Sequence, residues 1–292
     1  MNIKLGVHVS ISGSLSKSVD KALDMGCSAF QIFTRSPRQW KTKDIPIGES
    51  DLFIKKLKET PINLNSVIVH MPYLPNLSAP KSEMYQKSLE VFEEEITRCK
   101  ILQIPYLVIH LGSHLGHGSK NGVSQLIHAC NTAMDNNSEL NSPKNTVKIL
   151  LENSAGQKNS IGGSFDEIAE IFDILNSSNF GLCLDTCHAF AAGYDLSTEN
   201  GIIKLLDVIA DKIGLDKIKV IHLNDSKGDL GSKLDRHYHI GIGKIGEEGF
   251  KFLLNNRKLG HIPFIMETPV DDVRTDQDNI EYVKNLLKRK FD

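Results

Sequence analysis

Eight short apolar runs recur along the chain, and amphipathic segments separate them. Runs of this length and composition are typical of parallel strands that are buried on both faces. The predicted strands are residues 3–9, 29–34, 66–70, 106–110, 147–153, 180–185, 219–225 and 263–268. Apolar residues recur at helical spacing between or after them, most clearly over residues 14–26, 82–102, 164–176, 201–214 and 276–291.

The spacing of these strands indicates the fold. With His8, Phe33, His70, His110, Glu152, Asp185, His222 and Glu267 as strand ends, successive ends lie 25 to 45 residues apart. Each interval is long enough for a helical crossover. The chain is therefore predicted to be an α/β protein, a (β/α)8 TIM barrel, with an open doubly wound sheet as the alternative. Without a Gly/Ser/Pro-rich linker, residues 1–292 are expected to form a single domain, with a surface loop at 136–145.

Composition narrows the class of protein without identifying a partner. The 292 residues are 40% hydrophobic and 24% charged, with no long apolar span and no signal-peptide pattern at the start. Five cysteines, an odd number, argue against a disulfide framework. We expect a cytoplasmic protein, or one in the reducing compartment that holds the genome. A net charge of −2 argues against a general nucleic-acid coat, so a polyanionic partner would need a local source of positive charge.

Residues able to bind metal gather at the predicted strand ends. A lone histidine or aspartate there is more often a hydrogen-bonding group or a helix cap, but nine such residues together favour a metal centre. They are His70, His110, Glu152, Asp185, His222 and Glu267 at strand ends, and His188, Asp235 and His237 shortly after two of them. Nine ligands suit two or three ions that share a carboxylate, and the ions would supply the local positive charge.

The ligand types suggest the metal. Imidazole and carboxylate groups without paired thiolates suit zinc, with manganese or iron as competitors, in a catalytic site. Cys183 and Cys187 are the one objection, but their C-x-x-x-C spacing is wider than a zinc knuckle. Cys183 is interpreted as a small core residue and Cys187 as a turn residue.

Several segments resemble the endonuclease IV family of apurinic/apyrimidinic endonucleases. The most specific are LENSAGQ at 151–157, GLCLDTCHAFAAGYD at 181–195 and HLNDSKGDLGSKLDRHYHIGIGKIG at 222–246. GVHVSISGSL at 6–15, QIFTRSPRQW at 31–40, HMPYLPNL at 70–77 and HLGSH at 110–114 fit the same family. The matches run in order over nearly the whole chain. One departure is Leu111, which follows His110 where many relatives have proline.

The resemblance implies a TIM barrel with three Zn²⁺ ions, with Mn²⁺ or Fe²⁺ possible at one site. By similarity, the first ion is bound by His70, His110 and Glu152, with Glu152 as the catalytic bridge. The ligand sets implied for the other two ions are Glu152, Asp185, His222 and Glu267, and His188, Asp235 and His237.

The implied enzyme is a hydrolase of the deoxyribonuclease IV type that acts in base excision repair. It cleaves the phosphodiester bond 5′ to an abasic site and leaves a 3′-hydroxyl and a 5′-deoxyribose phosphate. Its substrate is double-stranded DNA with abasic sites or blocked 3′ ends. A monomer without membrane contact is expected, associated with the nucleoid if the source is prokaryotic.

The resemblance also implies DNA contacts near the strand ends. Arg38, Tyr73 and Leu74 are expected to hold a bent duplex open at the lesion, because an abasic nucleotide is cheap to flip. His8 is expected to support the ligands, and His239 is among the histidines that could contact phosphate.

Two other functions remain open at this stage. A sugar isomerase or epimerase on the same barrel would share histidine and carboxylate ligands with one or two metals. A lesion-binding protein without catalysis would bind abasic DNA and leave it uncut. Metal content near three ions per chain favours the nuclease over the isomerase.

Overall fold

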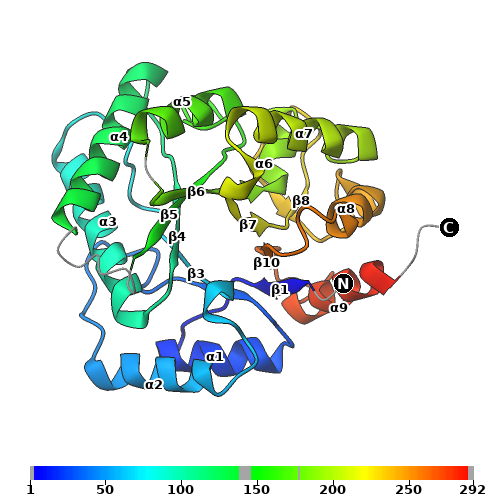
Figure 1. The fold of residues 1–292 in the computed structure, drawn as a ribbon, viewed down its shortest axis with the longest axis horizontal. Helices are drawn as coiled ribbons and strands as arrows, with labels where there is room; N and C mark the ends of the chain where they lie inside the picture. Colours follow the sequence, from blue (N-terminus) through cyan, green and yellow to red (C-terminus); the bar gives the residue numbers. More distant parts are fainter. Residues whose placement is uncertain (1–2, 138–145, 177, 289–292) are drawn as a thin grey trace.

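Parallel strands line the inside of a barrel in the computed structural model, which describes residues 3–137, 146–176 and 178–288 (Figure 1). The eight-stranded sheet has the order β1-β10-β7-β6-β5-β4-β3-β2. A parallel bridge between His8 and Gln31 joins its two edges, with Val9 N donating to Gln31 O at 2.7 Å. The predicted TIM barrel is confirmed and the open sheet is wrong. The strands are β1 Lys4–Val7, β2 Phe30–Ile32, β3 Val67–His70, β4 Tyr106–His110, β5 Lys148–Glu152, β6 Phe180–Asp185, β7 Ile218–His222 and β10 Pro263–Met266.

Helices surround the strands and bury their apolar faces against them (Figure 1). Side-chain caps start several of these helices, for example Ser82, which accepts from Tyr85 N, and Ser164, which accepts from Glu167 N. None of the helices in the described ranges has the length and apolarity needed to cross a membrane. The helices are α1 Leu15–Asp24, α2 Ile47–Lys58, α3 Glu83–Leu102, α4 Ser119–Asn136, α5 Phe165–Leu175, α6 Thr186–Ala192, α7 Glu199–Lys212, α8 Gly246–Asn255 and α9 Asp276–Lys288.

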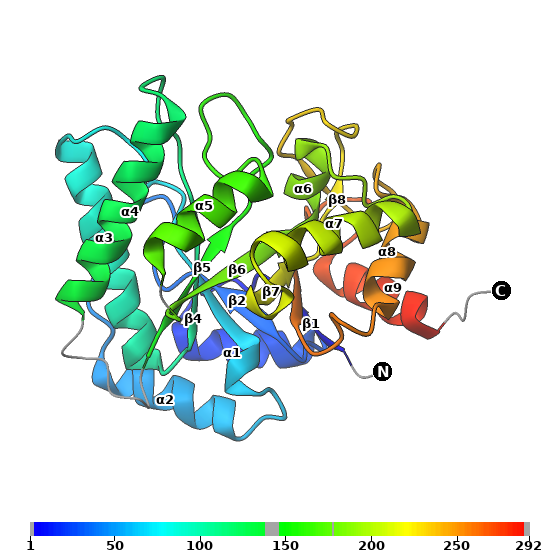
Figure 2. The same cartoon turned by 45° about the horizontal axis from the view of Figure 1, so that its top comes forward.

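The chain departs from a plain barrel after β6 and β7. The short helix α6 begins directly at the end of β6, before the crossover helix α7. A small antiparallel pair, β8 Asp225–Ser226 and β9 His237–Tyr238, follows β7 and lies beside α6 (Figure 2). The prediction of one strand over 219–225 is therefore wrong at its end, because Asp225 begins β8. From residue 138 on, the loop predicted at 136–145 lies outside the described residues.

The inside of the barrel has two layers, set by the two-residue period of the strands. The lower layer is apolar and consists of Ala29, Ile68, Val108, Leu150, Cys183, Val220 and Ile265. Two residues further along each strand lies the upper layer of polar side chains. Its members are Gln31, His70, His110, Glu152, Asp185, His222 and Glu267, and His8 joins them from the end of β1.

Candidate metal centre

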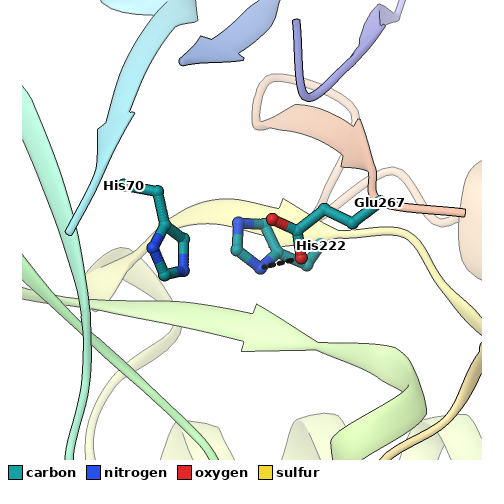
Figure 3. Close-up of side chains that lie close together, drawn as sticks. All are labelled: His70, His222 and Glu267. Atoms are coloured by element: carbon teal, nitrogen blue, oxygen red, sulfur yellow. Dashed lines mark ion pairs between the residues drawn. The ribbon is translucent and has the colours of Figure 1, made fainter. Parts of the chain in front are cut away.

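The upper layer brings the predicted ligands together. Eight of the nine fall into four overlapping groups, and within each group the ligand atoms lie within 4.8 Å of one another. Figure 3 shows one group, in which His70, His222 and Glu267 converge from three strands. The other groups are His70, His110 and Glu152; Asp185, His188 and His237; and Glu152, Asp185, His222 and Glu267.

Glu152 lies at the centre of the groups. Its Oε2 is 3.2 Å from Nε2 of both His70 and His110, and its Oε1 is 3.0 Å from His222 Nδ1. The side chain is 1% exposed. Burial alone would raise the pKa of this carboxyl, but the charges of His222 and His110 hold it well below its usual range. An ionised carboxylate with both oxygens directed at different imidazoles is suited to bridge two ions.

Asp185 has two roles at the end of β6. Its Oδ1 accepts from His188 N at 2.7 Å and thereby caps α6. Its Oδ2 accepts from Asn224 Nδ2 at 2.7 Å and lies 3.7 Å from His237 Nε2. The sequence left a helix cap and a metal ligand as alternatives for Asp185, and the geometry allows both, because Oδ1 makes the cap and Oδ2 faces the other candidate ligands. The cap also brings His188 into the same site.

The predicted set of His188, Asp235 and His237, the third ligand group, also comes together. Asp235 Oδ1 is 3.2 Å from His188 Nε2 and 3.6 Å from His237 Nε2. Burial opposes protonation of His188, but Asp185 and the other carboxylates outweigh it and raise its pKa to about 10. The carboxylates around His188 therefore favour a positive charge at this position.

The donor set fits divalent cations. His237 Nε2 is buried and has no hydrogen-bond partner, which is costly for a polar atom unless something binds it. His70, His188 and His237 each have Nδ1 next to a backbone carbonyl oxygen, at 2.7, 2.9 and 3.1 Å, which leaves Nε2 available to bind a cation. Neither Cys183 nor Cys187 belongs to a ligand group of the described chain. Cys187 lies buried in α6, so its prediction as a turn residue is wrong.

Two cavities open above the ligands. The larger, about 610 Å³, is lined by His8, Tyr73, His237, Glu267 and Val270 among others. The smaller, about 360 Å³, is also lined by Tyr73 and includes Leu74 and Glu152. Tyr73 is 60% exposed and Leu74 38%, so apolar groups stand at the rim of a polar site.

Comparison with known proteins identifies the family of the chain. Residues 19–289 match the family model described as xylose isomerase-like TIM barrel. The chain is 49% identical to a probable endonuclease 4 of Cenarchaeum symbiosum, over 97% of this chain and 99% of the relative. Its fold is similar to the crystal structure of endonuclease IV from Thermus thermophilus, with a TM-score of 0.85, 30% identity and coverage of 98% and 99%. The chain belongs to the endonuclease IV family.

Sugar-processing enzymes share the barrel of the endonuclease IV family at lower identity. A D-tagatose 3-epimerase-like protein matches with a TM-score of 0.73 and 19% identity, over 98% of this chain and 97% of that one. At this identity the likeness shows a common fold only.

The loop that contains Arg38 is tied to α3 by buried charges. Arg35 has a fully buried side chain, and its Nε donates to Glu95 Oε1 at 2.5 Å. Arg98 Nε donates to Thr34 Oγ1 at 2.7 Å. Arg38 itself is exposed. Burial and the charge of Glu267 raise the pKa of the Tyr73 phenol, and the charge of Arg38 opposes them without reversing the shift, so the guanidinium lies within electrostatic reach of Tyr73.

Three side chains that hydrogen-bond to the candidate ligands of this endonuclease IV family member were not predicted: Gln31, Asn153 and Asn224. Asn153 Oδ1 accepts from Asp185 N at 2.8 Å, and Asn224 donates to the same residue as described above. Both asparagines fall within the segments that resemble the family, so position after a strand end could have selected them. His239 was considered a phosphate contact, but it is fully buried and bonded to Asp271, so that expectation is wrong.

Proposed function

We propose that the protein is a metal-dependent AP endonuclease of base excision repair, which hydrolyses the phosphodiester bond 5′ to an abasic site. The products would be a 3′-hydroxyl and a 5′-deoxyribose phosphate. Membership of the endonuclease IV family supports this assignment. We further propose that residues 1–292 act as one domain, as a monomer in the cytoplasm, on double-stranded DNA with abasic sites or blocked 3′ ends.

One observation carries most of the proposal: His188 and His237 form a ligand group with Asp185, which also belongs to the group of Glu152, His222 and Glu267. Asp235 lies 3.2 and 3.6 Å from the two imidazoles. An isomerase or epimerase on this barrel would need only one or two metals. We propose three Zn²⁺ ions, with Mn²⁺ or Fe²⁺ possible at one site. The ligand sets would be His70, His110 and Glu152; Glu152, Asp185, His222 and Glu267; and His188, Asp235 and His237.

When bound, divalent ions in such a site neutralise charge on the phosphate oxygens and lower the pKa of water to near neutrality. The protein groups fix where this happens. Glu152 directs one oxygen toward His70 and the other toward His222, so it would hold two ions at a set separation. His188, His237 and Asp235 would hold the third ion beside the larger cavity, where its charge would stabilise a departing 3′-oxygen.

We assign recognition of the lesion to the rim of the site, which Tyr73, Leu74 and Arg38 form. An abasic nucleotide has no base to stack, so the duplex opens there at low cost. The exposed Tyr73 and Leu74, with Arg38 nearby, are placed to occupy the gap and keep the duplex bent. Lys227 and Arg236 lie on the loop between β8 and β9 that also carries Asp235, and both are exposed, so they offer positive charge for phosphates.

Incision of a duplex with one tetrahydrofuran abasic analogue tests the proposal. The purified protein should cut 5′ to the analogue, lose this activity after prolonged chelation, and regain it with zinc. A sugar ketose product with one or two metals per chain would instead support the epimerase, and bound but uncut duplex would support a lesion-binding protein.

Glu152→Gln separates catalysis from binding. Loss of the bridging charge should remove several kcal/mol of transition-state stabilisation, on the order of 10³-fold in turnover, while abasic duplex still binds. Near-normal single-turnover incision by Glu152→Gln would contradict the role of this carboxylate.

A further inference from the structure

The side chain of Gln31 holds two of the proposed ligands from within the upper layer of the barrel. It is fully buried. Its Oε1 lies 2.9 Å from His222 Nε2, and its Nε2 lies 2.7 Å from Glu267 Oε1 and 3.0 Å from His8 Nδ1. Both amide hydrogens and the amide oxygen therefore have partners, on three different strands.

The orientation of this amide follows from its neighbours. With oxygen and nitrogen exchanged, the amide oxygen would lie 2.7 Å from the Glu267 carboxylate, and neither group could donate a hydrogen bond. The nitrogen therefore faces Glu267, and the oxygen faces His222. Because an amide oxygen only accepts, His222 must have its proton on Nε2.

That proton determines which nitrogen of His222 is available to a metal. With Nε2 protonated, the lone pair of the neutral imidazole is on Nδ1. Nδ1 lies 3.0 Å from Glu152 Oε1. It also lies 3.3 Å from Glu267 Oε2, and Figure 3 marks this ion pair with a dashed line. Gln31 thus directs His222 Nδ1 and Glu267 Oε2 toward the same point.

His222 differs from three of the other histidines in the site. His70, His188 and His237 have Nδ1 fixed by backbone carbonyls, so they present Nε2. A backbone carbonyl remains after any substitution, whereas the partner of His222 is a side chain that a single substitution removes. The choice of nitrogen at His222 can therefore be tested directly.

We propose that Gln31 is a positioning residue of the metal centre, which selects Nδ1 of His222 as the ligand atom and orients Glu267 toward the same ion. The inference rests on the metal-binding part of the proposed function and does not depend on DNA cleavage. Partners of this kind change metal affinity by about 10–100-fold when they are removed. The same factor is expected here, at one ion only.

The test is Gln31→Met, which keeps the length of the side chain and removes both the donor and the acceptor. Zinc affinity of the holoprotein is measured by competition with a chelator, without DNA, and zinc per chain by elemental analysis. We expect one ion to bind about 10–100-fold more weakly and the others to be unchanged. Gln86→Met, on the exposed face of α3, is the matched control and should bind zinc as the native chain does.

A second measurement identifies the ligand atom. In ¹⁵N-histidine spectra of the zinc-loaded native protein, one ligating imidazole should have Nδ1 bound to metal and Nε2 protonated, and that Nε2–H signal should be lost or shifted in Gln31→Met. Gln31→Glu provides a variant with the same shape: its carboxylate still accepts from His222 but repels Glu267. It should keep the His222 signal and still lose zinc affinity.

The outcomes distinguish a failure of the proposed function from a failure of the inference about Gln31. If native protein binds no zinc, the proposed function itself is wrong. If native protein binds zinc and Gln31→Met binds it equally tightly, or if His222 is ligated through Nε2, the inference about Gln31 is overturned while the proposed function stands. Circular dichroism and thermal unfolding of the metal-free variants show whether they fold, and Gln31→Glu decides the question if Gln31→Met does not.

Discussion

Asp225 offers a direct test of how the third ligand group is held in place. Its side chain is fully buried, and its two oxygens accept four backbone N–H groups. Oδ1 accepts from Ser226 and Ile245 at 2.8 and 2.9 Å, and Oδ2 accepts from Gly241 and Gly243 at 2.9 Å each. Asp235 and His237 lie on the loop that these bonds close.

The loss of stability expected for Asp225→Asn follows from these four hydrogen bonds. An amide replaces one oxygen with an NH2 group, so two backbone donors face another donor whichever way the amide lies. A buried polar group without its partner costs about 1–3 kcal/mol, which gives about 2–6 kcal/mol for the pair. The loop cannot move closer to residue 225 to compensate, because it already packs tightly there: a Cβ added to Gly243 would lie 2.5 Å from Asp225 Oδ1.

Two assays check this prediction. Urea unfolding of metal-free protein should show the loss of about 2–6 kcal/mol, and zinc titration should show weaker binding of the ion assigned to His188, Asp235 and His237. Asp229→Asn is the control, since Asp229 is on the same loop with an 81% exposed side chain, and surface substitutions usually change stability by less than about 0.5 kcal/mol. An equally small change for Asp225→Asn would refute the reasoning, and a loss of stability with unchanged zinc binding would refute the link to the ligands.

Two further predictions concern the rim and the ligands. Tyr73→Ala should weaken binding of abasic duplex by about 1–3 kcal/mol, the range found for aromatic stacking on bases, while zinc content stays the same. Loss of zinc in this variant would mean that Tyr73 supports the site. Removal of metal should make stability depend on pH through His188. Burial opposes its protonation, but Asp185 and its neighbours raise the pKa from the ordinary 6.5 to about 10, so its contribution is complete below pH 6.5 and is lost as the pH rises through 10. Urea unfolding of chelated protein between pH 6 and 10 measures this, and a flat profile would contradict it.

The ligands at strand ends were predictable because they repeat one simple relation. Each follows a buried apolar residue by two positions, as His70 follows Ile68 and Glu152 follows Leu150. Gln31 obeys the same relation to Ala29, but the sequence pattern placed the end of that strand at Phe33. An apolar residue at the apparent end thus concealed the polar residue that faces inward.

Loop geometry was not predictable in the same way. The sequence places Asp235 and His237 about ten residues after Asp225, and only the resemblance to a family assigns them to one ion. In the structure, four backbone N–H bonds to Asp225 and the pairing of Ser226 with His237 close that loop beside α6. Hydrogen bonds from backbone N–H groups leave no pattern in the sequence. Hydrophobic periodicity therefore could not predict how the third ligand group is assembled.

The position of His222 shows most clearly how local geometry can override periodicity. Ile218 packs outward against the helices, so strict alternation along β7 would point Val220 and His222 outward as well. The pairing with β6 instead skips one residue: Leu182 pairs with Ile218, and Cys183 pairs with Val220. This bulge turns Val220 into the apolar interior layer and His222 into the ligand layer, opposite Asp185. A shift of one residue exchanges the two faces of a strand, so the site depends on an irregularity that no count of apolar positions in β7 would reveal.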